Sequence, residues 1–420
     1  MFETLSMIGL GYIGLPTATL FASRRKKVIG VDVNAYAVDT INQGRIHIVE
    51  PELDMLVQAA VHGGYLRATQ TPEPADAFLI AVPTPFLEGN KPDLSYIADA
   101  AKAIAPVLAK GNLVILESTS PVGTTEQLAQ WLAEARPDLS FPQQAGEEAD
   151  IQVAYCPERV LPGRVVHELV SNDRVIGGMT QKATEMAIEL YRIFVEGALV
   201  PTNARTAEMC KLTENSFRDV NIAFANELSL ICDRLNINVW ELISLANRHP
   251  RVNILQPGAG VGGHCIAVDP WFIVDKTPEE ARIVRLAREI NDYKPEWVVE
   301  KVKAAILDVV SSGAVKHIED VKVACLGLAF KPDIDDLRES PAMEITKKIC
   351  EIGCSVSVVE PNVVALPPSL KESNVTYTDL QGGLSNSDVT VVLVKHKEFL
   401  VEKEKIGEGR SVIDAVGLLE

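Results

Sequence analysis

The chain has 420 residues, of which 47% are hydrophobic, so it is long enough to form two or three domains with separate cores. Acidic residues number 57 and basic residues 40, and the net charge of -17 opposes binding to nucleic acid or to an anionic membrane surface. We therefore expect no nucleic-acid or membrane partner, and an anionic ligand has to be held by a few Lys and Arg side chains gathered at one site.

The seven cysteines are an odd number spread thinly along the chain, which is typical of reduced thiols in the cytoplasm. Cys350 and Cys354 lie four residues apart without a second Cys/His cluster to complete a zinc site, so we expect core thiols and no metal. At the N-terminus Glu3 precedes an apolar run and basic residues follow it, the reverse of a secretory signal. The sequence contains no uninterrupted stretch of about 18 apolar residues, so we expect no membrane span. We expect a cytoplasmic protein.

The first part of the chain alternates strand-like and helix-like segments. Apolar runs predict strands at residues 4–11, 27–33, 77–83, 112–119, 153–159 and 173–178. Helical patterns occur at 95–108 and 182–194. Apolar strands that alternate with helices are typical of a parallel sheet covered on both faces. We therefore predict a Rossmann-like, doubly wound domain over residues 1–200.

Residues 204–235 contain neither Gly nor Pro and predict one long helix. This helix carries an apolar stripe at helical spacing, formed by Val220, Phe224, Leu228, Ile231 and Leu235. A helix of this length needs a partner along its length. It either packs against the same helix of a second subunit or lies buried within one chain. We place a central helical segment at residues 201–314.

A second helical run, at 279–310, leads into strand-like segments at 321–330, 355–361 and 389–396, with a helix at 342–353. These segments predict a second, smaller α/β domain over residues 315–420. The expected fold class is therefore α/β, with two Rossmann-like doubly wound domains joined by the long central helix.

The stretch GLGYIG, residues 9–14, has the G-x-G-x-x-G spacing through Gly9, Gly11 and Gly14, directly after a strand and before a helix. Such glycines let the backbone turn sharply and approach a pyrophosphate at the helix N-terminus. Asp32 ends the next strand, where a carboxylate accepts hydrogen bonds from a ribose hydroxyl. The alternative interpretation, a tight strand-to-helix turn that binds no cofactor, does not explain the position of Asp32. We predict NAD rather than NADP, since an aspartate repels the extra phosphate.

Two pairs of polar residues have competing interpretations. Thr84 in VPTP and Thr119 in ESTSPVG follow apolar strands, where doubly wound sheets bind ligands, but threonines also cap helices. Lys211 and Asn215 lie one turn apart on the long helix. They either face solvent or point into a cleft, where they polarise a substrate oxygen.

Cys265 lies in the stretch GVGGHCIAVDP, residues 260–270, with His264 before it and Asp269 after it. A single cysteine is most often a small buried hydrophobe. Backbone N–H groups of a glycine-rich loop, however, stabilise negative charge and lower the pKa of a thiol, and the thiolate is the nucleophile. The glycines around Cys265 therefore favour a nucleophile.

A dinucleotide fold combined with a cysteine nucleophile predicts a particular reaction. Hydride transfer from a primary alcohol gives an aldehyde, to which the thiolate adds to form a thiohemiacetal. Loss of a second hydride gives a thioester, which water hydrolyses to the acid. The expected reaction is a four-electron oxidation that uses two NAD. A two-electron alcohol dehydrogenase is an alternative, but it leaves Cys265 idle.

These motifs, in this order and across essentially the whole chain, resemble those of the UDP-sugar 6-dehydrogenases, the relatives of UDP-glucose dehydrogenase. The motifs are GLGYIG, VPTP, ESTSPVG, CPER, EMCKLTENSFRDVNIAFANEL, PGAGVGGHCIAVDP, GLAFKPDIDDLRESPA and VVEP. The resemblance implies an N-terminal NAD-binding domain, a central helical segment that forms a homodimer, and a C-terminal domain that binds the UDP half of the substrate.

The resemblance also implies catalytic roles. Cys265 is the nucleophile, while Lys211 and Asn215 polarise the C6 oxygen of the sugar and stabilise the oxyanion. Glu158 of CPER and Thr119 position water and relay protons.

Asp269 is implied to serve as the base for hydrolysis or to support it. The implied contacts to NAD come from Gly9, Gly11, Tyr12, Ile13, Gly14, Asp32, Thr84, Thr119 and Arg338. Those to the nucleotide sugar come from Arg159, Lys211, Asn215, Arg251, Asn253, Gly262 and Lys331. Cations at these positions meet the charge of a diphosphate, although ordinary surface charge is the alternative for Lys331 and Arg338.

Two positions depart from the pattern of UDP-glucose dehydrogenases. In those enzymes a Lys usually precedes the aspartate that follows the cysteine, and a small residue precedes the cysteine. In this chain Val268 precedes Asp269, and His264 precedes Cys265. This pattern, with NRHPRVNILQPG and GGHCIAVDPWF, resembles the branch that acts on UDP-N-acetyl-D-mannosamine for bacterial surface polysaccharides. No spacing fixes the configuration at C2, so UDP-N-acetylglucosamine and UDP-glucose stay open. A sensor that binds without turnover is a further alternative.

Overall fold

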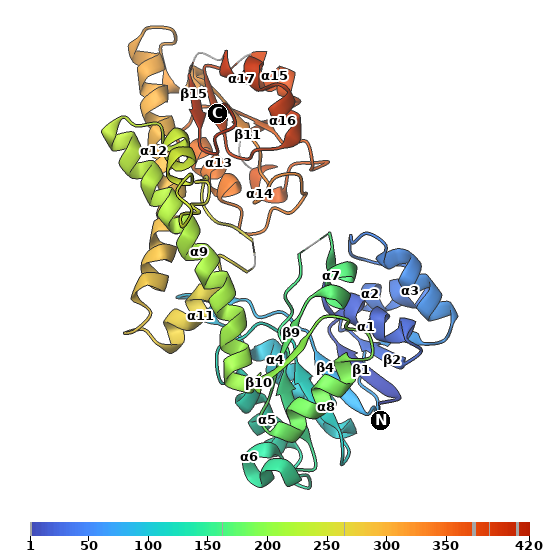
Figure 1. The fold of residues 1–420 in the computed structure, drawn as a ribbon. Coiled ribbons are helices and arrows are strands. Elements are labelled where there is room, and N and C mark those ends of the chain that lie inside the picture. The colour runs from blue at the N-terminus through green and yellow to red at the C-terminus, as the bar shows by residue number, and fades with distance from the viewer. Residues whose placement is uncertain (1, 162, 264, 372–374, 386, 409–410) are drawn as a thin grey trace. The chain divides into compact units, whose positions relative to one another are not determined.

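The computed structural model describes residues 2–161, 163–263, 265–371, 375–385, 387–408 and 411–420 (Figure 1). The chain divides into two compact units, Met1–Glu214 and Asn215–Glu420. The division falls inside the long helix α9 (Ala204–Leu235), whose bounds are those that the sequence predicts. No helix of the described residues is long and apolar enough to cross a membrane.

The N-terminal unit is built on a sheet that has eight strands in the described residues, in the order β10-β9-β8-β7-β4-β1-β2-β3. Neighbouring strands are parallel except for β8 and β9. The run β3-β2-β1-β4-β7-β8 is the doubly wound order of Rossmann domains. The strands are β1 (Thr4–Ile8), β2 (Lys27–Val31), β3 (Leu66–Thr69), β4 (Ala77–Ile80), β7 (Leu113–Leu116), β8 (Gln152–Tyr155), β9 (Arg174–Gly178) and β10 (Leu199–Asn203).

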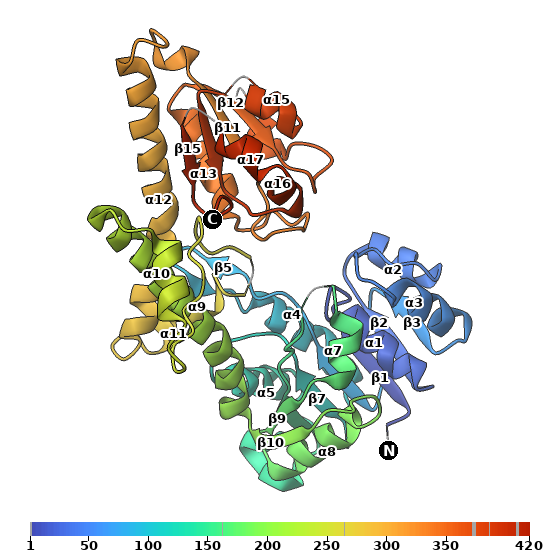
Figure 2. The same cartoon turned by 45° about the horizontal axis from the view of Figure 1, so that its top comes forward.

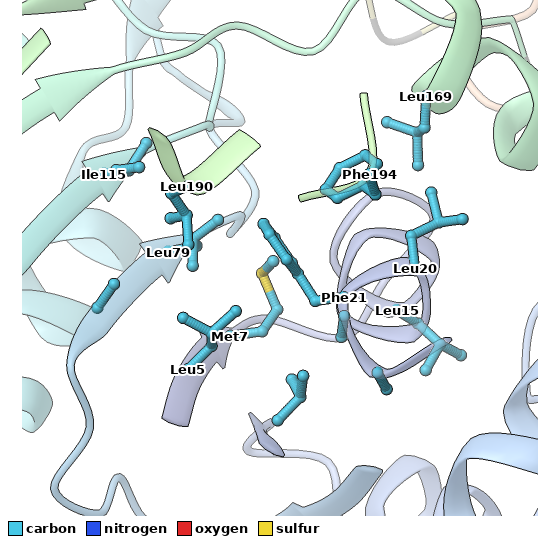
Figure 3. Packing of buried hydrophobic residues seen from close by; sticks show 14 of the residues in the cluster. Leu5, Met7, Leu15, Leu20, Phe21, Leu79, Ile115, Leu169, Leu190 and Phe194 are labelled. Atoms are coloured by element: carbon cyan, nitrogen blue, oxygen red, sulfur yellow. The ribbon is translucent and has the colours of Figure 1, made fainter. Parts of the chain in front are cut away.

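Helices cover both faces of this sheet because successive strand residues point to opposite sides. In β4, Ala77 and Leu79 enter the core under α1, α7 and α8, and Phe78 and Ile80 enter the core under α4 and α5. Figure 3 shows the first of these cores around Phe21. The helices are α1 (Gly14–Ser23), α2 (Ala35–Asn42), α3 (Leu53–His62), α4 (Ser95–Ile104), α5 (Thr124–Ala135), α6 (Pro142–Ala145), α7 (Val165–Ser171) and α8 (Gln181–Tyr191), with a hairpin of β5 (Phe86–Leu87) and β6 (Lys91–Pro92).

The C-terminal unit contains a parallel sheet with the order β13-β12-β11-β14-β15. Its strands are β11 (Lys322–Leu326), β12 (Ser355–Val359), β13 (Val375–Tyr377), β14 (Val389–Val392) and β15 (Val412–Asp414). Helices α12 (Arg282–Ser311) and α13 (Pro341–Glu351) pack on one face, and α15 (Leu380–Ser385), α16 (Lys397–Val401) and α17 (Lys403–Gly407) on the other (Figure 2). Shorter helices are α10 (Val239–Ala246), α11 (Asp269–Lys276) and α14 (Pro368–Lys371). The two sheets and the central helix confirm the predicted fold class.

Candidate active site

The three fingerprint glycines meet different demands after β1. A Cβ on Gly9 would lie 2.4 Å from the carbonyl oxygen of Ala81, and Gly9 also has a φ of +91°. A Cβ on Gly14 would lie 1.8 Å from the carbonyl oxygen of Gly9. A Cβ on Gly11, in contrast, would meet nothing within 4 Å. Gly9 and Gly14 are therefore required for packing, while Gly11 leaves open space where a pyrophosphate can approach the α1 N-terminus.

Asp32 follows β2 and faces this loop. Its Oδ2 accepts the backbone N–H of Leu10 at 2.9 Å, and its Oδ1 accepts that of Asn34 at 2.9 Å. Burial lowers the pKa of His47, and the nearby charge of Asp32 opposes that shift. His47 is thus a neighbour of the fingerprint that the sequence patterns do not identify. Tyr12 and Ile13 lie in the loop itself, with Tyr12 42% exposed and Ile13 directly before α1.

Thr84 and Thr119 join the two loops that follow β4 and β7. The hydroxyl of Thr84 donates to the carbonyl oxygen of Thr119 at 2.6 Å. This bond joins two loops, so Thr84 does not serve as a helix cap. The loop after β7 is also tied to α9, because the buried Glu208 carboxylate accepts the N–H groups of Gly123 at 2.7 Å and Thr125 at 2.8 Å. Both predicted threonines therefore stand at the carboxyl ends of parallel strands, where doubly wound sheets bind ligands.

Lys211 is buried, not solvated, and reaches the CPER segment. Its Nζ donates to the backbone oxygen of Glu158 at 2.7 Å. The Oε1 atom of Glu158 is enclosed and has no hydrogen-bond partner in the described residues. Burial raises the pKa of Glu158 to about 7, although the charges of Lys211 and Arg174 oppose the shift. Arg159 pairs with Glu214, with Nη2 2.6 Å from Oε1.

A buried polar cluster lies behind the CPER segment. The guanidinium of Arg174 approaches the Sγ of Cys156 at 3.7 Å and Glu117 Oε1 at 4.0 Å. Tyr191 donates its hydroxyl to Glu117, and the Arg174 guanidinium stacks 4.7 Å from the centre of its ring. Arg174 is a charged residue at the start of an apolar strand, which is the one sequence signal that marks it. It stabilises the ionised form of Glu158.

In the C-terminal unit, the glycine loop, defined as residues 257–263, packs against the segment 330–341. A Cβ on Gly262 would lie 2.3 Å from the carbonyl oxygen of Glu339, and one on Gly263 would lie 2.9 Å from the ring of Phe330. The N–H of Gly263 donates to the Arg338 carbonyl oxygen at 3.3 Å. Side chains at these glycines would force the loop away, so the glycines permit close approach.

Cys265 follows the glycine loop and is exposed. Its carbonyl oxygen accepts the N–H groups of Val268 at 3.1 Å and Asp269 at 2.8 Å, which leads the chain into α11. The buried Asp269 carboxylate accepts a hydrogen bond from the amide of Asn215 on α9. Cys265, Asp269 and Asn215 are thus parts of one local structure. His264 lies outside the described residues.

A pocket of about 230 Å³ lies beside the glycine loop. The loop lines it with Pro257 to Gly260, and the facing segment with Phe330 and Pro332, so the exposed Lys331 stands between two lining residues. The Arg338 side chain is paired with Asp336, with Nη2 2.6 Å from Oδ2. Arg251 and Asn253 are exposed in the loop after α10 and do not line this pocket in the described part of the chain.

The chain matches the UDP-glucose/GDP-mannose dehydrogenase family along most of its length. Residues 3–195 match its NAD binding domain, residues 205–293 its central domain and residues 324–420 its UDP binding domain. The UDP-N-acetyl-D-mannosamine dehydrogenase of Yersinia pestis is 66% identical over 419 residues, 99% of each chain. An NDP-N-acetyl-D-galactosaminuronic acid dehydrogenase of Ralstonia nicotianae is 63% identical over 99% of this chain and 96% of its own.

A solved structure agrees with these matches. The UDP-D-ManNAc dehydrogenase of Pyrococcus horikoshii superposes with a TM-score of 0.87 at 38% identity, covering 99% of this chain and 96% of the other. The motifs quoted above and the order of the three matched domains therefore have one explanation. The chain is an NAD-dependent dehydrogenase that belongs to the UDP-glucose/GDP-mannose dehydrogenase family.

Proposed function

We propose that the protein oxidises C6 of UDP-N-acetyl-D-mannosamine to the carboxylate, giving UDP-N-acetyl-D-mannosaminuronate for bacterial surface polysaccharides. The observation that carries the proposal is the exposed Cys265, which lies two residues after a glycine loop whose residues 257–260 line a pocket together with residues of the matched UDP binding domain. An exposed cysteine close in the chain to a pocket-lining loop is suited to attack an aldehyde, whereas a structural cysteine is buried.

NAD fits the residues of the N-terminal unit. The open space at Gly11 suits the pyrophosphate, and Asp32 suits the ribose hydroxyls. Tyr12, Ile13, Thr84 and Thr119, on the loops after β1, β4 and β7, with Arg338, complete our proposed set of NAD contacts. NAD, when bound, accepts the hydride released in each oxidation.

The first oxidation needs a polarised C6 oxygen. Lys211 and Asn215 stand one turn apart on α9, and we assign to them the polarisation of this oxygen and the stabilisation of the later oxyanion. Loss of a hydride and a proton from the alcohol gives the aldehyde. The Cys265 thiolate then adds to the aldehyde carbon, forming the C–S bond of a thiohemiacetal.

The second oxidation and hydrolysis complete the reaction. Loss of a hydride and a proton from the thiohemiacetal leaves a thioester on Cys265. Water attacks the thioester carbon, the C–S bond breaks, and the thiolate is restored together with the acid. We assign the proton transfers to Glu158, whose pKa burial raises to about 7, with Thr119 positioning the water and Asp269 supporting the base.

The sugar specificity rests on similarity to relatives. The Yersinia pestis protein, at 66% identity, is named for UDP-N-acetyl-D-mannosamine, and the Ralstonia nicotianae protein, at 63% identity, for an N-acetyl-D-galactosaminuronic acid. The second name makes UDP-N-acetyl-D-galactosamine a competing substrate. Our contacts for the nucleotide sugar are Arg159, Lys211, Asn215, Arg251, Asn253, Gly262 and Lys331.

We also infer a cytoplasmic homodimer with domains at residues 1–200, 201–314 and 315–420. Of the predicted stripe, Phe224, Ile231 and Leu235 are 52%, 46% and 61% exposed, whereas Val220 and Leu228 are half-buried. Phe217, seven residues before Phe224, is 70% exposed. Such an exposed apolar stripe supports packing against a second copy rather than burial within one chain. The odd number of cysteines, spread thinly along the chain, suits a reducing compartment.

The test is a comparison of kcat/KM for UDP-N-acetyl-D-mannosamine, UDP-N-acetylglucosamine, UDP-N-acetyl-D-galactosamine and UDP-glucose, with NAD in excess. We expect the manno sugar to exceed the others by about 100-fold, since a site that hydrogen-bonds its substrate penalises a misplaced polar group. A higher kcat/KM for any other sugar would overturn the assignment of the substrate while leaving the reaction type intact.

A further inference from the structure

One face of α9 in the C-terminal unit carries polar side chains that reach beyond the helix. Asn215, Asp219, Asn226 and Ser229 follow at intervals of four, seven and three residues, which places them on one side of a helix. Asp219 and Asn226 are fully buried. Buried polar groups destabilise a fold unless they are hydrogen-bonded, so these positions need partners of a defined kind.

The partners form a directed chain of hydrogen bonds. The Asp219 Oδ1 atom accepts from Arg288 Nη1 at 2.7 Å and from Asn291 Nδ2 at 2.8 Å. The Asn291 Oδ1 atom then accepts from Asn226 Nδ2 at 2.8 Å. The Asn226 Oδ1 atom finally accepts the backbone N–H of Gly258 at 2.9 Å. An ionised carboxylate only accepts, so Asp219 orients both amides and leaves an acceptor facing Gly258.

Gly258 lies within the glycine loop, so α9 holds the chain on both sides of the nucleophile. Asn226 binds the chain before Cys265, at Gly258, and Asn215 binds it after Cys265, at Asp269. The two asparagines are three helical turns apart on one rigid helix, about 16 Å at the usual rise of 1.5 Å per residue. These two attachments to one helix restrict the position of Cys265, which lies between them.

We propose that Asn226, oriented by Asn291 and Asp219, is a positioning residue that sets the place of the Cys265 thiol through Gly258. This inference rests on the proposed function and deepens it. Without the Asn226 acceptor, the N–H of Gly258 has to find another partner, and the start of the glycine loop moves with it. A displacement of about 1 Å at a reacting atom lowers a rate by about 100-fold.

The first test compares Asn226→Ala with Ser229→Ala. Ser229 is also buried on α9, where its hydroxyl donates to the Asn226 backbone oxygen and accepts from Lys294 of α12, and in the described residues it makes no hydrogen bond to the glycine loop. Hydrogen exchange of residues 257–263 reports the loop without substrate, and steady-state kinetics report catalysis. For Asn226→Ala we expect loop exchange about tenfold faster and kcat at least about tenfold lower, with KM within about threefold of its original value.

For Ser229→Ala we expect the original loop exchange and kcat, with a lower Tm. The inference is overturned if Asn226→Ala leaves loop exchange and kcat unchanged, or if Ser229→Ala changes both to the same extent. If the unmodified protein oxidises none of the four sugars, the proposed function fails, while the exchange measurement still decides the role of Asn226.

A second variant, Asn226→Asp, tests the orientation of the amides. An ionised carboxyl at this position repels the Asn291 Oδ1 atom, whereas a protonated carboxyl donates to Asn291 and still accepts from Gly258. The kcat of this variant, divided by that of the unmodified protein at the same pH, should therefore rise as the pH falls. A ratio that does not change with pH would contradict the hydrogen-bond chain and favour a purely steric role.

Discussion

Glu158 illustrates how a side chain obtains its chemistry from its surroundings. Its Oε1 atom is enclosed without a partner in the described residues, and burial raises its pKa to about 7. The charges of Lys211 and Arg174 keep the pKa from rising further. A carboxyl that titrates near neutrality takes and returns protons under physiological conditions, as the hydrolysis of a thioester requires.

This titration predicts a pH dependence. The rate of acid formation should rise as the pH increases through about 7, because Glu158 must be ionised to take a proton from water. In Glu158→Gln the rise should disappear and the rate should fall by about 100-fold, measured by rapid quench in a single turnover. If the variant retains the same rise, another group titrates.

The free energy of unfolding should decrease over the pH range in which the rate of acid formation rises. The folded protein holds the Glu158 proton up to about pH 7, whereas the unfolded chain releases it near the ordinary glutamate pKa of 4.5. Ionisation therefore disfavours the folded state, and the contribution of Glu158 to stability decreases as the pH rises from 4.5 towards 7.

Asp32 predicts the choice between cofactors. Its carboxylate is held by the N–H groups of Leu10 and Asn34, so it is fixed before NAD binds. Asp32→Ala should weaken NADH binding by about tenfold or more, the usual effect of losing a hydrogen bond to a charged group, and should bind NADPH more tightly than the unmodified protein does. Fluorescence titration with both nucleotides measures this. Unchanged exclusion of NADPH would show that another group selects against the phosphate.

At the scale of elements, α9 has two functional faces. Its polar face supplies Lys211 to Glu158 in the N-terminal unit and Asn215 to Asp269 in the C-terminal unit. Its apolar face exposes Phe217, Phe224 and Ile231. The absence of Gly and Pro predicts the bounds of this helix, but the sequence leaves open whether the apolar stripe is buried within the chain.

The exposed stripe predicts the effect of a charge on α9. Phe224→Glu should convert the dimer to monomers, because a carboxylate at the centre of an apolar interface loses its water without gaining a partner. Tyr96→Glu is the control, since Tyr96 on α4 is 48% exposed, close to the 52% of Phe224, but lies outside α9. Light scattering after gel filtration measures the mass. A Phe224→Glu protein that remains dimeric would place the interface elsewhere.

Across the whole molecule, sequence patterns predict features that repeat with a fixed period or that involve residues close together in the chain. Apolar strands such as Ala77–Ile80 alternate between two cores, and the fingerprint spacing predicts the place of Asp32. The short edge strand β3 (Leu66–Thr69) escapes such prediction, because it has only two buried residues, Leu66 and Ala68, with the exposed Arg67 between them.

Partners that are distant in the sequence are not predictable in this way. Asn226 meets Gly258 and Asn291 through the packing of a loop and α12 against α9. Its spacing of eleven residues from Asn215 places both on one helix face, but no pattern states what that face contacts. Arg174, at the start of β9, likewise meets Glu117 only because β8 and β7 lie beside it in the sheet.

The role of Cys265 in both oxidations is tested by the number of NADH formed for each UDP-N-acetyl-D-mannosamine consumed. If Cys265 carries the intermediate through both oxidations, two NADH should form for each sugar, and the product should be the acid. Cys265→Ser, which lacks the thiolate, should form no acid by this route. A ratio of one NADH for each sugar, with aldehyde as the product, would contradict the four-electron reaction and the role of Cys265.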